Sequence, residues 1–183
     1  MSYLLESLGR GLLGRLSDGL GDRLPDVSAA TESDLIQAVS DAPTSADAHL
    51  RLATWYWHVE RYADADRFFS RARALADDPR PAAVGQACVA DALGQLEAVL
   101  RHLSFIAARD PHDPAIAFSI GFTYERRGNT VAAIANYRRA IELHPHLRNA
   151  YERLAAIAIR DREYAEAIAL YATLVELEPE SPD

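Results

Sequence analysis

Apolar residues recur along this chain at a fixed interval of 34 residues. The segments AIANYRRAIELHP (133–145) and AIALYATLVELEP (167–179) lie 34 positions apart and share seven of thirteen residues. The same spacing extends toward the N-terminus through Ala65, Phe69 and Ala72, then Val99, Leu103 and Ile106. A period of this length indicates structural units that bury their apolar faces only by stacking on their neighbours.

The period defines four consecutive units, at 46–79, 80–113, 114–147 and 148–181. Each unit predicts two helices separated by a break near its fifteenth position. In the third unit, Ile120, Gly121 and Tyr124 share one helical face, and Gly128 marks the turn before the second helix. Pro145 then prevents this second helix from continuing.

These positions resemble the tetratricopeptide-repeat motif, in which W-x2-L-G-x2-Y on the first helix is followed by A-x3-F, A and P. The third unit is the best copy, with Ala117, Ile120, Gly121, Tyr124, Ala133, Tyr137, Ala140 and Pro145 at the motif positions. Gln86 and Val99 depart from the motif in the second unit, although Gly94 and Pro111 keep its phase. The resemblance covers about three quarters of the chain. It implies an all-α fold, a right-handed α-solenoid of four helix–turn–helix units over 46–183, with an N-terminal helical extension.

Residues 1–27 are predicted to form a separate amphipathic, glycine-rich helix. Its apolar face carries six leucines: Leu5, Leu8, Leu12, Leu13, Leu16 and Leu20. Five of the chain's nine glycines also lie here, and each costs about 0.5–1 kcal/mol inside a helix, so we expect this helix only where its leucines are covered. Three roles fit this leucine face. It packs on the repeats, docks on a partner or another copy, or lies on a membrane surface.

Residues 28–45 are predicted to be a linker that contains a short helix at 32–41. Thr31 and Asp34 have the spacing of a helix-capping pair, and Pro43 lies where a repeat-ending proline would fall one period earlier. We expect this helix to act as a half-repeat that covers Leu52 and Tyr56 of the first unit.

The family resemblance also implies which side chains line a peptide-binding groove on the first helix of each unit. The candidates are Leu50, Trp57, Val84, Phe118, Phe122, Arg126, Asn149, Arg153 and Arg160. Some relatives bind a carboxylate through lysines and asparagines in this groove, and only Arg153 matches that pattern here. An apolar or amphipathic peptide with an acidic end suits the remaining surface. Alternatively, Glu125 and Glu152 pair with the three arginines as ordinary salt bridges.

The last predicted helix carries more apolar residues than one buried face needs. They are Ile168, Leu170, Tyr171, Leu174, Val175 and Leu177. Large exposed apolar patches are uncommon on soluble monomers, so we expect a covering partner. A second copy, another protein or further sequence would each serve, and the sequence does not rank them.

Composition narrows the environment and the partners. The net charge of −8 argues against a general nucleic-acid-binding surface. Cys88 is the only cysteine, which fits a reducing compartment. No stretch approaches the roughly 20 apolar residues that cross a bilayer, and the N-terminus lacks the pattern of a secretory signal. We therefore expect a cytoplasmic location.

The sequence offers no convincing catalytic, cofactor or metal site. His112, His144 and His146 lie in predicted turns between units, but lack the ligand spacing of a zinc site. Cys88 is better explained as a small residue on a packed helix than as a nucleophile. Phosphate-binding loops, Rossmann glycine patterns and serine elbows are missing from the sequence. We do not expect an enzyme.

Together these features predict a non-catalytic adaptor or scaffold, chaperone-like in character, that holds a protein or peptide partner on its first helices. The alternative is a self-assembling homo-oligomer whose N-terminal helix docks on a neighbouring copy or on a membrane surface.

Overall fold

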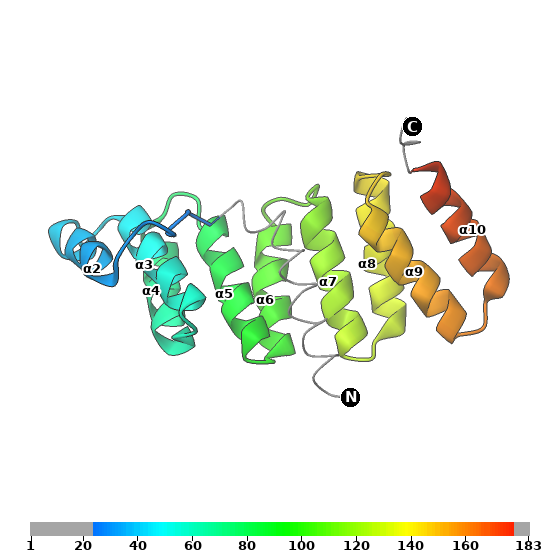
Figure 1. The fold of residues 1–183 in the computed structure, drawn as a ribbon, viewed down its shortest axis with the longest axis horizontal. Coiled ribbons are helices and arrows are strands. Elements are labelled where there is room, and N and C mark those ends of the chain that lie inside the picture. Colours follow the sequence, from blue (N-terminus) through cyan, green and yellow to red (C-terminus); the bar gives the residue numbers. More distant parts are fainter. Residues whose placement is uncertain (1–23, 178–183) are drawn as a thin grey trace. The chain divides into compact units, whose positions relative to one another are not determined.

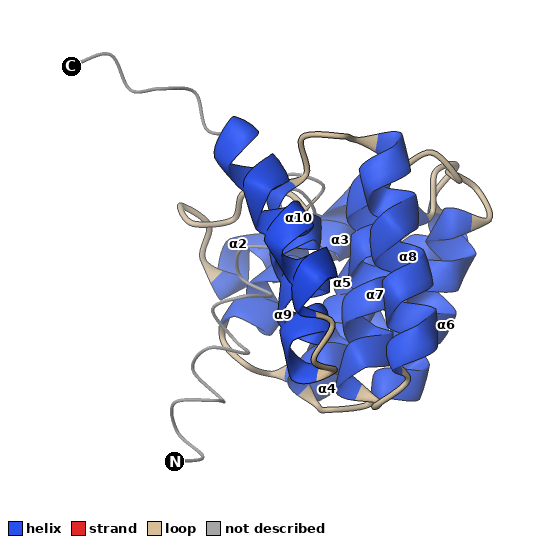
Figure 2. Ribbon diagram, turned by 90° about the vertical axis from the view of Figure 1, so that its right-hand side faces the viewer, coloured by secondary structure: helices blue, strands red, loops and turns tan. Residues whose placement is uncertain are grey.

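The computed structural model describes residues 24–177, and every regular element in that range is an α-helix (Figures 1 and 2). The chain divides into two compact units, one ending at Arg109 and one beginning at Asp110. Unit 1 contains α2 (Glu32–Asp41), α3 (Ala46–His58), α4 (Tyr62–Leu75), α5 (Arg80–Ala92) and α6 (Leu96–Ala107). Unit 2 contains α7 (Pro114–Arg126), α8 (Thr130–Leu143), α9 (Arg148–Arg160) and α10 (Tyr164–Glu176).

The predicted period is present in the helix boundaries. First helices begin at Ala46, Arg80, Pro114 and Arg148, which are 34 residues apart. Second helices begin at Tyr62, Leu96, Thr130 and Tyr164, with the same step. The prediction of an all-α fold built from four helix–turn–helix units is therefore confirmed.

The turn between paired helices repeats with the same backbone. Its left-handed residue is Glu60, Gly94, Gly128 or Arg162, with φ of 60°, 70°, 77° and 65°. The following N–H donates to the carbonyl five residues earlier, as Arg61 does to Tyr56 at 2.9 Å and Asn129 to Tyr124 at 2.9 Å. Glycine adopts this conformation freely, whereas a residue with a side chain pays roughly 1–2 kcal/mol. The two outer turns form without glycine, so the packed helix pair imposes the turn.

In unit 1, α2 completes the core of the first helix pair. Leu35 of α2 joins a buried cluster that includes Leu52, Tyr56 and Phe69. The Phe69 ring lies against Gly85 of α5, where an added Cβ would come within 2.2 Å of the ring. Gly85 is therefore needed for α5 to approach α4, which explains a glycine inside a helix.

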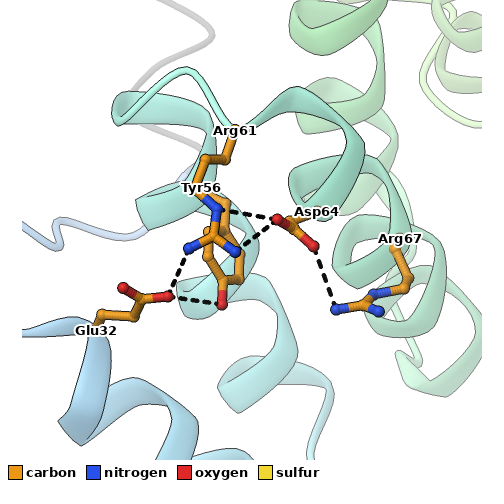
Figure 3. Close-up of polar contacts among 5 residues, drawn as sticks. All are labelled: Glu32, Tyr56, Arg61, Asp64 and Arg67. Atoms are coloured by element: carbon orange, nitrogen blue, oxygen red, sulfur yellow. Dashed lines mark hydrogen bonds and ion pairs between the residues drawn. The ribbon is translucent and has the colours of Figure 1, made fainter.

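Polar contacts hold the start of α2 (Figure 3). The Thr31 hydroxyl accepts the Asp34 N–H at 3.2 Å and caps the helix, as the sequence predicts. Glu32 accepts the Tyr56 hydroxyl at 3.1 Å and the Arg61 guanidinium at 2.7 Å. Arg61 also pairs with Asp64 at 2.7 Å. The α2 helix is thus tied to the first helix pair at its N-terminus and through Leu35.

Two predictions concern membranes or the N-terminal segment. The leucine face of Leu5, Leu8, Leu12, Leu13, Leu16 and Leu20 lies outside the described residues. Within residues 24–177, none of the helices combines the length and apolar character needed to cross a membrane.

Candidate peptide-binding surfaces

In unit 1, α3 carries two of the predicted groove residues and α5 carries one. Leu50 and Trp57 are partly exposed on α3, and the Trp57 ring lies 4.8 Å from that of His58. Thr54, between them, is buried and donates its hydroxyl to the Leu50 carbonyl at 2.9 Å. Val84 of α5 is only 1% exposed, contrary to the expectation that it lines an open surface. Leu50 and Trp57 are the accessible candidates in this unit.

In unit 2, both predicted aromatic anchors are buried. Phe118 is 1% exposed and its ring lies 5.2 Å from the Tyr137 ring, so it belongs to the helix-pair core. Phe122 is 5% exposed and lies beneath two guanidinium groups, those of Arg126 at 5.9 Å and Arg153 at 5.3 Å. The expectation that these rings form an open aromatic surface is not met. The cations above Phe122 form the accessible layer instead.

Arg153 is fixed by a partly buried ion pair with Glu125. Two of its nitrogens donate to the Glu125 carboxylate at 2.7 and 3.0 Å, and the Tyr137 hydroxyl donates to the same carboxylate at 2.6 Å. Burial and this carboxylate raise the pKa of Tyr137 well above its usual value. The alternative in which Glu125 pairs with an arginine is confirmed for Arg153.

The other polar candidates of unit 2 are exposed. Arg160 pairs with Asp161 at 3.1 Å and donates to the Thr130 hydroxyl at 3.0 Å, which brings it to the turn between α7 and α8. Arg126 lies at the end of α7, beside that turn. Ile159 is 45% exposed next to Arg160, and Asn149 is exposed at the other end of α9. Glu152 pairs with Arg148 at 2.9 Å instead of with a predicted groove arginine.

We call Phe122, Arg126, Arg153, Ile159 and Arg160 the α7–α9 surface. It combines one exposed aliphatic side chain with three guanidinium groups, one of which Glu125 neutralises. Such a surface can bind an apolar side chain and an adjacent carboxylate, because arginine offers paired donors that match carboxylate geometry.

Unit 1 also contains a polar network that the sequence analysis did not anticipate. Gln86 accepts from Arg73 at 2.9 Å and donates to the Ser70 hydroxyl at 2.9 Å. The guanidinium groups of Arg73 and Arg109 lie 3.7 and 3.6 Å from the centre of the Phe105 ring. The available signal was Gln86 itself, a polar residue that departs from the repeat motif.

The cysteine and the histidines show no arrangement that favours catalysis. Burial, together with the Asp91 carboxylate, raises the pKa of Cys88 to about 12, which keeps the thiol protonated near neutral pH. The His144 and His146 rings lie 6.2 Å apart. Within the described part of the chain, no three histidine, cysteine or acidic side chains are grouped to hold a metal ion.

Comparison with known proteins identifies the repeat. The family model for the tetratricopeptide repeat matches residues 116–146, which covers most of α7, the following turn and all of α8. The chain is a tetratricopeptide-repeat protein. No match was found among curated proteins.

Solved structures of other tetratricopeptide-repeat proteins share its fold. MamA residues 41 to the end, from Desulfovibrio magneticus RS-1, is 16% identical with a TM-score of 0.72, over 98% of this chain and 97% of that one. YrrB, described as a tetratricopeptide-repeat protein with an unusual peptide-binding site, is 16% identical with a TM-score of 0.66, over 97% and 83%. PilF of Pseudomonas aeruginosa is 18% identical with a TM-score of 0.70, over 96% and 75%. At these identities the likeness establishes the fold class of this tetratricopeptide-repeat protein.

Proposed function

We propose that this tetratricopeptide-repeat protein is a non-catalytic interaction scaffold that binds a peptide of a partner protein on the α7–α9 surface. The fold supports this role, because repeats of paired helices present extended surfaces for binding. The peptide-binding site described for YrrB gives a precedent within the same fold.

The observation that carries the proposal is the layer of cations held over Phe122. Arg153 is fixed by two hydrogen bonds to Glu125, and Arg126 lies over the same ring. A side chain that is already ordered loses little conformational entropy when a ligand binds. Arginine and aromatic residues are also common energetic anchors of interfaces.

The chemistry of the surface defines its ligand. Ile159 offers an apolar contact beside Arg160, and Arg126 lies near the same α7–α8 turn. Glu125 already occupies Arg153, so Arg126 and Arg160 are the cations left to attract an acidic group. The preferred ligand is a peptide with an apolar residue followed by acidic residues or a free carboxylate.

Binding of defined peptides tests this proposal. The probes are labelled peptides of about 15 residues that differ only in whether an apolar core is followed by acidic or basic residues. We expect the acidic series to bind about tenfold or more tightly, and Arg126→Glu with Arg160→Glu to remove that preference. Arg139→Glu on α8, an exposed arginine outside this surface, is the matched control and should leave binding unchanged.

Two results would reject the α7–α9 surface as the binding site. One is equal binding of the acidic and basic series to the unchanged protein. The other is a loss of binding in Arg139→Glu as large as in the double variant, which would indicate a general charge effect.

The self-assembling alternative also has a specific observation in its favour. Four large apolar side chains are exposed on α10, outside the α7–α9 surface.

A further inference from the structure

The helix α10 exposes an apolar stripe along one face. Tyr164, Ile168, Tyr171 and Val175 follow one another at steps of four, three and four residues, which places them on one side of a helix. Their exposed fractions are between 47% and 70%. Figure 1 shows α10 as the last helix of unit 2. We call these four residues the α10 stripe.

The same position is buried elsewhere in each unit, which shows what kind of element is missing. Tyr137 of α8 lies 34 residues before Tyr171 and is fully buried, whereas Tyr171 is 47% exposed. The α8 helix packs against the next first helix, α9, whose Arg153 joins Tyr137 on Glu125. In unit 1 the equivalent Phe69 is buried against Gly85 of the next first helix, α5. The α10 stripe therefore has the form of a second-helix face that lacks a following first helix.

The N-terminal segment of the chain has the sequence of such a first helix. Leu5, Leu8, Gly9 and Leu12 have the same spacing as Ala117, Ile120, Gly121 and Tyr124 of α7. Its predicted leucine face extends eleven residues from Leu5 to Leu16, the same length as the α10 stripe from Tyr164 to Val175. At the helical rise of about 1.5 Å per residue, both stripes are about 16 Å long, so each can cover the other.

Charge does not oppose this pairing. The α10 helix contains Glu166 and Glu176 and no basic residue. The N-terminal segment contributes Arg10 and Arg15 within the length of its leucine face. Basic residues beside an acidic helix favour association over repulsion.

We propose that the α10 stripe is an acceptor face on which residues 1–23 of a second copy of this chain dock as an additional first helix. The contact joins two different surfaces, so each copy offers one donor and one acceptor, and assembly proceeds head to tail. This contact uses different residues from the α7–α9 surface and stands or falls separately from peptide binding there.

Complementation between two variants tests the proposal. The acceptor variant carries Ile168→Asp and Val175→Asp, and the donor variant carries Leu8→Asp and Leu12→Asp. Sedimentation of the full chain should show concentration-dependent assembly for the unchanged protein and monomers for each variant alone. An equimolar mixture of the two variants should give a dimer, because one intact donor and one intact acceptor remain. Val131→Asp, at an 81% exposed residue of α8, is the control and should assemble normally.

Each other outcome overturns the proposal. A monomeric unchanged protein would mean that the stripe is covered within one chain or by a different partner. Assembly of the donor variant alone would indicate that two α10 stripes pack on each other. A mixture that stays monomeric would exclude the donor–acceptor contact.

A direct binding measurement protects the test against misfolding. A labelled peptide of residues 1–23 should bind the donor variant, and binding should fall about tenfold or more when Ile168→Ser and Val175→Ser are added. Far-UV circular dichroism should be unchanged, because these side chains are exposed. Equal peptide binding with and without the serine substitutions would reject the α10 stripe as the acceptor.

Discussion

Each unit contains a cluster of one tyrosine, one glutamate and one arginine, and the two clusters differ in burial. In unit 1, Tyr56 and Arg61 both donate to Glu32, and the side chains of Arg61 and Glu32 are 48% and 36% exposed. In unit 2, Tyr137 and Arg153 both donate to Glu125, and the arginine and glutamate side chains are 29% and 14% exposed.

The difference in burial assigns different roles to the same three residue types. The exposed cluster joins α2 to the first helix pair across a surface that water already solvates, so its ion pair contributes little to stability. In the covered cluster, loss of one partner leaves a charge that water reaches poorly, which is costly. The unit 2 cluster is therefore the stronger constraint on structure, and it also holds the cation layer over Phe122.

The largest expected effect is that of Arg153→Ala. Glu125 would lose its charged partner while remaining mostly covered, and the free energy of unfolding should fall by about 2–3 kcal/mol. Urea unfolding followed by circular dichroism measures this loss. Arg138→Ala, which removes an exposed pair with Glu166, is the control and should have little effect. Equal losses in both variants would show that burial does not distinguish the clusters.

Removal of the tyrosine hydroxyl should have a smaller effect. Tyr137→Phe deletes a 2.6 Å hydrogen bond to a carboxylate, and the expected loss of stability is about 1.5 kcal/mol. Tyr56→Phe deletes a longer bond, at 3.1 Å, to a more exposed glutamate and should cost less. The same unfolding measurement compares the two variants, and a larger loss for Tyr56→Phe would reverse the ranking of the clusters.

Alkaline pH should affect the covered cluster selectively. Burial and Glu125 raise the pKa of Tyr137, so the folded protein keeps this proton at a pH where the unfolded chain loses it. The contribution is constant below the unfolded value of about pH 10, and stability then falls by up to about 1.4 kcal/mol per pH unit above it. Tyr137→Phe should lose less stability between pH 9 and 11 than the unchanged protein (both limits approximate). Parallel pH profiles would contradict this assignment.

The smallest expected effect is at the exposed cluster. Arg61→Ala should destabilise the protein less than Arg153→Ala, and the difference from the unchanged protein should largely disappear in about 0.5 M salt, because ions screen exposed charges. The effect of Arg153→Ala should persist in the same salt. A salt-resistant loss for Arg61→Ala would show that α2 is held by a pair more covered than its exposure indicates.

Local patterns in the sequence predict the framework well. The 34-residue phase fixes where each first and second helix begins, and Thr31 with Asp34 marks the start of α2. Both signals depend on residues within a few turns of one another, so the sequence contains them directly.

Contacts between helices are harder to predict. Repeat position indicates the direction of a side chain such as Phe122, but its exposure depends on the neighbours that cover it, here Arg126 and Arg153. The choice of Arg153 as the partner of Glu125 depends on a contact across 28 residues. The network of Gln86 depends in the same way on Ser70 and Arg73 of another helix.

The repeated left-handed turn has a consequence for how this gene product can change in length. Because Glu60, Gly94, Gly128 and Arg162 share one backbone conformation at one spacing, loss or duplication of a whole unit exchanges one turn for an equivalent one. An insertion of any other size within a unit would place that conformation inside a helix or remove it from the bend. Length variation among natural or engineered versions should therefore be quantised in steps of one repeat.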